Sequence, residues 1–206
     1  LLMVGHFRDD GNLNYRSSNK LKIPFNFPSF SLNNWSVKAF NWLYYGKVKG
    51  DVTRQRVNID TFFYPLDGIG NWNRIYGKNG FTQYQFILPL ETSYDGLVEI
   101  LEAIAESGKG SFLAVLKLYG QSNDNYLSFP MEGYSLALDF KVEVNLFDLL
   151  DTLDQVVLKY KGRIYLAKDV RVSKEVFEQG YPHVEKFRDI RKKYQMNETL
   201  NSLQSH

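Results

Sequence analysis

The chain has 206 residues, which is enough for one domain with a hydrophobic core or for one domain with an appended segment. Its 25 Lys and Arg residues nearly balance its 23 Asp and Glu residues, and the two kinds are mixed, so the charge gives no sign of nucleic-acid binding. The sequence has no cysteine and only 3 histidines, which excludes disulfides, zinc–thiolate sites and thiol nucleophiles, and no metal site is expected.

The chain begins LLMVGHF, without an initiator Met and without the basic segment of a signal peptide. We therefore expect it to be cut from a longer protein, whose targeting signals would lie upstream. No apolar run in the sequence is long enough to cross a bilayer. The expected location is the cytoplasm or a membrane surface.

Residues 1–24 are polar and irregular, whereas residues 25–45 are crowded with aromatic side chains. Pro28 opposes a helix at the start of this aromatic segment, but Asn33 and Asn34 could begin a short one further on. The aromatic side chains either pack on a domain or act as a lid, or they form an apolar surface for a partner domain or an apolar substrate tail.

From Phe81 onward the hydrophobic periodicity becomes regular. Alternating apolar residues predict strands, and apolar residues at helical spacing predict helices. The expected elements are a strand at 81–88, a helix from Thr92 or Ser93 to Gly108, strands at 111–119 and 134–142, a helix from Asn145 to Gly162, a strand at 163–168, and helices starting near Ser173 and Val184. This β-α-β-β-α-β order predicts an α+β fold of the ferredoxin-like type, with an antiparallel sheet, helices on one face, and a C-terminal helical tail.

In such a sheet the first, third and second strands lie side by side, and each has one apolar face suited to the helices. The alternation places a polar set on the opposite face: Gln83, Gln85, Lys117, Tyr119, Ser135, Ala137 and Asp139. This face is either a solvated surface or the wall of a ligand pocket. Ile87, Leu113 and Val115 share the face and favour a pocket, because ligand sites are mainly apolar with a few placed polar groups.

Two motifs suggest chemistry, and each also has a plainer interpretation. Gly68 and Gly70 could belong to a nucleotide loop, but they do not follow a strand and open a helix, so turn chemistry explains them. Lys168 could be an edge charge paired with Asp169 or Arg171, or a fixed cation near a flavin or a substrate oxygen. No pair of carboxylates suited to glycoside hydrolysis stands out.

Long motifs in the second half of the chain carry a family resemblance. They are FFYPLDGIGNWNRIYGKNGFTQYQFILP, SFLAVLKLYG, LSFPMEGYSLALDF, GRIYLAKDVR and YPHVEKFRDIRKKY. Together they resemble the C-terminal half of FAD-linked oxidases of the vanillyl-alcohol-oxidase type. Within that family they resemble the decaprenylphosphoryl-β-D-ribose 2'-oxidase group, with D-arabinono-1,4-lactone oxidases as relatives. The resemblance extends from about Phe62 to Tyr194 and is loose before that.

The resemblance implies an enzyme of two domains, in which a sheet-based substrate domain closes over the ring of FAD. Residues 1–162 would form the substrate-binding domain, and residues 163–206 would return to the flavin domain. The N-terminal FAD-binding domain would be absent from this chain. By itself the chain would then bind no FAD tightly and would not turn over, so it should not purify yellow.

The resemblance also assigns roles to residues. It puts Gln83, Gln85, Lys117, Tyr119, Ser135 and Ala137 in the substrate pocket, Phe63 and Tyr64 near its entrance, and Tyr165 and Lys168 at the flavin edge. Two positions depart from the family pattern. Ser135 replaces a longer amide of relatives, and Ala137 stands where some relatives have cysteine, so it offers no target to thiol-directed inhibitors. Both departures leave the exact substrate open.

The implied reaction is the oxidation of a secondary alcohol on a sugar by hydride transfer to flavin. Lys117 and Lys168 are the candidates for polarising or orienting the hydroxyl, with Gln85 as a positioning group. A lipid-linked pentose and a free sugar lactone are the rival substrates, and the aromatic segment 25–45 favours the lipid. The expected partners are that sugar, a membrane surface, and a reductase as the second subunit of a two-step epimerase. A non-catalytic binding module that uses the same polar face is the alternative from another class.

Overall fold

The computed structural model describes residues 4–7, 11, 21–28, 31, 34–48, 50–64, 68–111, 113–196 and 199–200. The chain forms two compact units, Leu1–Gly80 and Phe81–His206. Within the described residues, no helix combines the length and the apolar character needed to span a membrane.

The first unit has little regular structure. Its elements are β1 (Leu21–Lys22), α1 (Asn34–Tyr45), α2 (Ile59–Phe63), β2 (Ile69–Gly70) and the 3-10 helix η2 (Trp72–Tyr76). The strands β1 and β2 pair in parallel. The Arg74 guanidinium donates to the carbonyl oxygens of Ile23 (3.0 Å) and Pro24 (2.6 Å), which holds the segment after β1 against η2. The short helix expected after Asn33 is present as α1.

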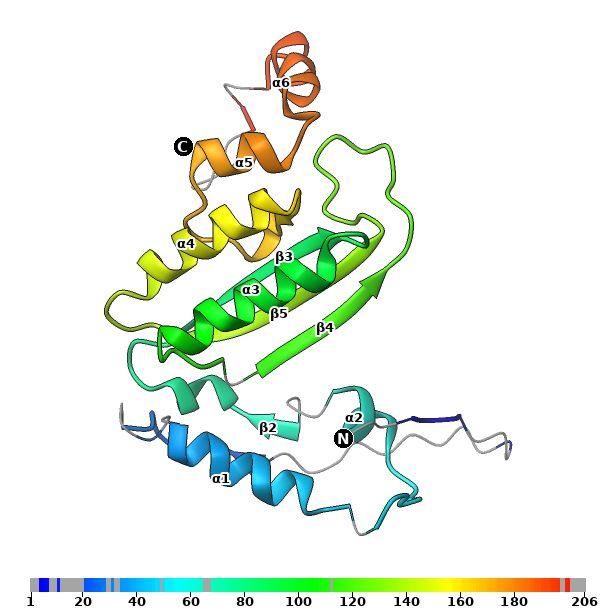
Figure 1. The fold of residues 1–206 in the computed structure, drawn as a ribbon, viewed down its shortest axis with the longest axis vertical. Helices are drawn as coiled ribbons and strands as arrows, with labels where there is room; N and C mark the ends of the chain where they lie inside the picture. The colour runs from blue at the N-terminus through cyan, green and yellow to red at the C-terminus, as the bar shows by residue number, and fades with distance from the viewer. Residues whose placement is uncertain are drawn as a thin grey trace. The chain divides into compact units, whose positions relative to one another are not determined.

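The second unit contains a four-stranded sheet and most of the regular structure. Its elements are β3 (Phe81–Pro89), α3 (Ser93–Glu106), β4 (Leu113–Tyr119), β5 (Gly133–Lys141), α4 (Leu146–Lys159), β6 (Arg163–Ile164), η3 (Leu166–Lys168), α5 (Lys174–Gly180) and α6 (Val184–Lys193). The strand order is β4-β5-β3-β6, and every neighbouring pair is antiparallel. The helices α3 and α4 lie on the same face of the sheet (Figure 1). The predicted α+β fold with its ferredoxin-like strand order is confirmed.

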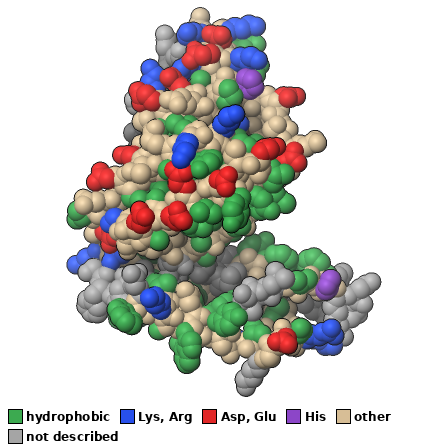
Figure 2. Space-filling view, in the orientation of Figure 1, with side chains coloured by type: hydrophobic (Ala, Val, Ile, Leu, Met, Phe, Trp, Pro, Cys, Tyr) green, Lys and Arg blue, Asp and Glu red, His purple; other side chains and the backbone are tan. Residues whose placement is uncertain are grey.

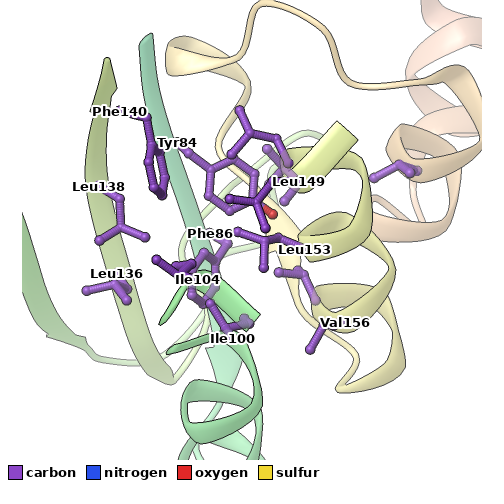
Figure 3. Close-up of a cluster of buried hydrophobic side chains, with 14 of the residues drawn as sticks. Tyr84, Phe86, Ile100, Ile104, Leu136, Leu138, Phe140, Leu149, Leu153 and Val156 are labelled. Atoms are coloured by element: carbon purple, nitrogen blue, oxygen red, sulfur yellow. The ribbon is translucent and has the colours of Figure 1, made fainter. Parts of the chain in front are cut away.

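The main core lies between the sheet and these two helices (Figure 3). Its buried members are Tyr84, Phe86, Leu88, Ile100, Ile104, Leu136, Leu138, Phe140, Leu146, Leu149, Leu150, Leu153, Val156, Val157, Ile164 and Val176. Alternate residues of β3 and β5 point into it, and the apolar stripes of the helices meet them. Each such side chain contributes roughly 1.5–3 kcal/mol through its burial. The core therefore uses one face of the strands, and a second, smaller buried cluster with Ile87, Phe129 and Met131 lies on the other face.

The return from α4 to the sheet requires a residue without a side chain. A Cβ atom added at Gly162 would lie 2.4 Å from the carbonyl oxygen of Ile87 and 2.9 Å from Cγ1 of Val157. Real Cβ contacts are not this short, and the backbone of a central strand cannot easily move away. Gly162 thus lets the chain pass close to β3 before it pairs with that strand.

The fourth strand is much shorter than the expected range 163–168, because only Arg163 and Ile164 pair with β3. The N–H of Tyr165 still donates to the carbonyl oxygen of Gln85 (2.8 Å), but the N–H of Lys168 turns back to the carbonyl oxygen of Tyr165 (3.1 Å). The carboxylate of Asp169 then accepts from the amides of Arg171 and Val172. These local hydrogen bonds stabilise a turn in place of further strand.

Two helices follow the turn. The hydroxyl of Ser173 accepts from the amide of Val176 and caps α5, as the sequence predicts. The described residues after β6 lie in the same compact unit as β3 to α4. The assignment of residues 1–162 to a substrate domain and of 163–206 to a flavin domain stays a prediction.

Candidate functional site

The residues of the predicted polar face come together on the side of the sheet opposite the helices. In β3 and β5, Gln83 lies opposite Asp139 and Gln85 lies opposite Ala137. In β4 and β5, Lys117 lies opposite Ser135. Directly opposed residues of an antiparallel pair share one face. We call this surface the polar face; its members are Gln83, Gln85, Ile87, Leu113, Val115, Lys117, Tyr119, Ser135, Ala137 and Asp139.

Gln85 is the most firmly held amide of the polar face. Its Nε2 donates to Oγ of Ser135 at 3.0 Å. The two side chains are 2% and 0% exposed. Its backbone carbonyl oxygen accepts from the N–H of Tyr165 at 2.8 Å, so both the backbone and the side chain are fixed. A buried amide with a defined orientation suits the positioning of a polar ligand group.

Gln83 and Asp139 form the second polar pair. Nε2 of Gln83 donates to Oδ1 of Asp139 at 2.9 Å. Asp139 is 2% exposed, and its Oδ2 is buried without a hydrogen-bond partner. Burial raises the pKa of Asp139, against the opposing effects of the Gln83 hydrogen bond and the Lys168 charge. The sequence placed Asp139 on this face but did not single it out as a site residue.

Aromatic residues from three segments pack together beside these pairs. The ring of Phe129 lies 4.4 Å from that of Tyr165 and 6.0 Å from that of Tyr119, the latter at 89°. Ile87 and Met131 complete the cluster. Sequence reasoning missed Phe129 and Met131, because they lie in a loop without hydrophobic periodicity. The sequence shows only that these two apolar residues follow a polar stretch of the loop.

A small cavity joins the β3 side of the polar face to the turn after β6. Its lining includes Gln83, Gln85, Tyr165 and Lys168, but also Arg171 and the core-side residues Thr82, Tyr84, Leu150 and Ile164, and its volume is about 10 Å³. That is room for about one water molecule, whereas sites for drug-sized ligands measure about 300–1,000 Å³. The cavity is therefore the size of a hydroxyl group or a water molecule, and it does not hold a sugar by itself.

Three of the residues predicted for the site are exposed and lie outside the buried part of the polar face. Lys117 is exposed on β4. Phe63, at the end of α2, and Tyr64, which follows it, are 53% and 57% exposed and belong to the other compact unit. Their place at a pocket entrance stays a prediction.

A second ionic cluster lies on the helix side of the sheet. The hydroxyl of Tyr84 donates to Oδ1 of Asp154 at 2.9 Å, and Arg171 donates to both oxygens of Asp154 at 2.9 Å. Arg171 also pairs with Asp151, one turn earlier on α4. The sequence offered a signal for this cluster, since Asp154 falls beside the apolar residues Leu153 and Val156. Neither a ligand nor a metal is needed to explain it, and no group of described residues could hold a metal ion.

Comparisons with known proteins show a similarity to an oxidase. No family model matches it. It is 37% identical over 180 residues to a protein of Mycolicibacterium smegmatis named decaprenylphosphoryl-beta-D-ribose oxidase, covering 87% of this chain and 39% of that protein. It is 35% identical over 98 residues to an uncharacterized protein in the mprA 5' region of Streptomyces coelicolor, covering 47% of this chain and 27% of that protein.

The chain thus spans less than half the length of these two relatives. The first similarity nonetheless extends over most of this chain, and it confirms the resemblance seen in the motifs. The chain is related to the FAD-linked oxidases of the decaprenylphosphoryl-β-D-ribose oxidase type.

Proposed function

We propose that the chain is the substrate-binding part of an FAD-dependent oxidoreductase that oxidises a secondary alcohol of a lipid-linked pentose. The similarity to a decaprenylphosphoryl-beta-D-ribose oxidase supports the reaction class and the sugar. The observation that carries the proposal is the polar face, where Gln85 and Ser135 form a buried hydrogen-bonded pair beside Lys168. Such a surface combines apolar side chains with a few fixed donors, as ligand sites do.

The residues near the turn after β6 fit a flavin ring. Tyr165 and Phe129 give a flat aromatic surface, and Lys168 gives a cation beside it. A cation near the isoalloxazine ring stabilises the reduced, anionic form. In the proposed enzyme Tyr165 and Lys168 would contact FAD, which when bound would accept a hydride from the carbinol carbon.

The chain's own residues would then orient the alcohol. Lys168, and in a lesser role Lys117, would donate a hydrogen bond to the hydroxyl oxygen and lower the energy of the developing alkoxide, while a base or a water molecule takes the hydroxyl proton. Gln85 would hold a neighbouring hydroxyl, because its amide is already fixed by Ser135. The ketone product would be a substrate for a reductase, which supports a reductase as the expected partner in an epimerisation.

Helix α1 supports a lipid-linked substrate over a free lactone. Trp35 and Trp42 are 82% and 75% exposed, and Figure 2 shows hydrophobic side chains along this helix. Lysines accompany the rings: Nζ of Lys47 lies 4.6 Å from the ring centre of Tyr44. Exposed Trp and Tyr together with Lys are typical of helices that lie at a membrane interface. We therefore include peripheral membrane contact in the proposal.

The test uses the full-length protein that carries this chain. Flavin reduction is followed by stopped-flow absorbance after mixing, without oxygen, with a polyprenylphosphoryl pentose or with a free aldonolactone. We expect reduction by the lipid-linked sugar. Activity on the lactone alone would reject the preferred substrate, and reduction by neither sugar would reject the proposed function.

The same assay tests the role of Lys168. Lys168→Ala should lower the rate constant of flavin reduction by roughly 100-fold or more, which is the usual loss when a donor that stabilises a developing negative charge on oxygen is removed. Lys174→Ala is the matched control, because Lys174 is an exposed lysine of α5. An unchanged rate in Lys168→Ala would remove Lys168 from the mechanism.

A further inference from the structure

The loop between β4 and β5, residues 120–132, brings one aromatic ring to the polar face. The ring centre of Phe129 lies 4.4 Å from that of Tyr165 and 6.0 Å from that of Tyr119. Phe129 is 5% exposed, although residues 121–126 of the same loop are exposed. The loop contains no helix or strand, so contacts with other segments must hold this ring in place.

Arg163, the first residue of β6, holds the backbone of the loop. Its Nη1 donates to the carbonyl oxygen of Ser128 at 2.7 Å, directly before Phe129 in the chain. Arg163 also lies opposite Ile87 of β3, and Ile87 belongs to the same buried cluster as Phe129. The second ring of the close pair, Tyr165, follows β6 in the chain. Both rings of the pair are therefore attached to one short strand.

Arg163 is itself fixed from behind. Its guanidinium carbon lies 5.4 Å from the ring centre of Tyr181, whose hydroxyl donates to the carbonyl oxygen of Ile164 at 2.7 Å. Nε of Arg163 is buried without a hydrogen-bond partner, and burial lowers the pKa of the side chain. A buried cation with an unsatisfied donor is a poor source of net stability. The contact with the loop is what this side chain provides.

We propose that Arg163 is a positioning residue, which fixes the loop at Ser128 and so keeps the ring of Phe129 against that of Tyr165, on the surface that would receive the flavin ring. This inference rests on the proposed function. Without the hydrogen bond the loop can move away from β6, while Tyr165 stays on its own segment. The main core should keep its packing, because Arg163 is not a member of it.

The contact with the loop is tested by amide hydrogen exchange in the full-length protein. Arg163→Met keeps a long apolar side chain but removes the donors. Exchange in residues 120–132 should become roughly tenfold faster, as expected when a hydrogen bond from a charged donor is lost, while β3 and β5 should exchange as in the wild type. Arg188→Met is the matched control, because Arg188 lies on α6 and pairs with Glu178 and Glu185. Equal exchange of the loop in Arg163→Met and the wild type would overturn the proposal.

The positioning role is tested on the flavin of the same protein. Arg163→Met should shift the visible absorption band of the bound flavin and lower the rate constant of its reduction at saturating sugar by roughly tenfold to 100-fold, the usual loss when a reacting ring is misplaced. The affinity for the sugar should change much less. Arg163→Lys should recover part of the rate, because it keeps a donor but not the flat group that lies over Tyr181.

The outcomes separate this inference from the proposed function. If Arg163→Met loosens the loop but matches Arg188→Met in flavin spectrum and rate, the positioning role is overturned, while the proposed oxidation stands. If the wild-type protein reduces its flavin with neither sugar, the proposed function fails, and the exchange measurement still decides whether Arg163 holds the loop.

Discussion

Among the described residues, one buried aspartate lies on each side of the sheet, and the two differ in their hydrogen bonds. On the helix side, Asp154 accepts from Tyr84 and twice from Arg171, so both of its oxygens are satisfied. On the polar face, Asp139 accepts one hydrogen bond from Gln83, and its second oxygen has no partner. A fully paired acid stabilises the fold, whereas a half-paired acid remains available to other groups. The contrast separates a structural cluster from a candidate site.

The pKa directions agree with this contrast only in part. Burial raises the pKa of Asp154 as well, against its bonds to Arg171. For Arg171, burial opposes the charge, but the hydrogen bonds and charge of Asp154 raise its pKa overall. The raised pKa of Asp154 thus indicates that burial outweighs the ion pair, whereas the raised pKa of Arg171 indicates that the ion pair outweighs burial. We favour an ionised pair, because a guanidinium that donates to both oxygens of a carboxylate is the strongest geometry available to these groups.

The largest effect is expected on the helix side. Arg171→Met should lower the free energy of unfolding by about 3–5 kcal/mol, because it leaves the Asp154 charge buried without its cation. Lys159→Met is the control, since its pair with Glu99 is exposed and should barely change the melting temperature. The chain's tryptophans, Trp35, Trp42 and Trp72, all lie in the first unit. Unfolding of the second unit is therefore followed by far-ultraviolet circular dichroism in urea. A small loss of unfolding free energy in Arg171→Met would show that the paired aspartate of the helix side does not stabilise the fold more than the aspartate of the polar face.

A smaller effect is expected at the best-paired position of the polar face. Ser135→Ala leaves Nε2 of Gln85 buried without its acceptor and should cost about 1–2 kcal/mol in urea unfolding. Adding Gln85→Leu removes the orphaned donor, so the double variant should recover part of that loss. A double variant that is less stable than Ser135→Ala would mean that the Gln85 amide has partners other than Ser135.

The smallest effect, and of opposite sign, is expected at Asp139. The pKa of Asp139 is raised in the folded chain, so folding disfavours its charged carboxylate. The stability that the protonated carboxyl contributes is complete below the pKa of the unfolded chain, and it is lost as pH rises through the pKa of the folded chain. Asp139→Asn should therefore be more stable than the wild type at pH 7, by roughly 1 kcal/mol or less. That advantage should shrink as pH falls toward the ordinary Asp value of about 3.9. Urea unfolding at pH 7 and pH 4 measures both. A variant that is clearly less stable at pH 7 would place Asp139 with Asp154 as a structural acid.

Much of the second unit was predictable from sequence, because its periods are regular. Two helical stripes and three alternating strands gave the order of elements from which the strand order was predicted, and the alternation alone brought Gln83, Gln85 and Ser135 to one face. The first unit carries no such period, and there only the short helix near Asn34 could be foreseen. The sequence shows that this unit is rich in aromatic residues, but it does not indicate how their side chains pack.

The parts of the site that were missed depend on contacts between distant segments. Phe129 reaches the polar face from a loop, and no local pattern shows where a loop will pack. The partners of Asp154 come from β3 and from the turn after β6, so its pairing could not be inferred from α4 alone. The unsatisfied oxygen of Asp139 likewise becomes visible only when all of its neighbours are known.

The early end of β6 decides to which side of the sheet Lys168 belongs. Odd and even positions of a strand alternate between faces. In the register in which Ile164 lies opposite Phe86, a continued strand would have set Lys168 opposite Thr82, on the same side as the core. The 3-10 turn at Leu166–Lys168 breaks that parity, and Lys168 instead lines a small cavity with Gln83 and Gln85. A change that promotes continuation of the strand through this turn would therefore aim the Lys168 side chain at the hydrophobic core.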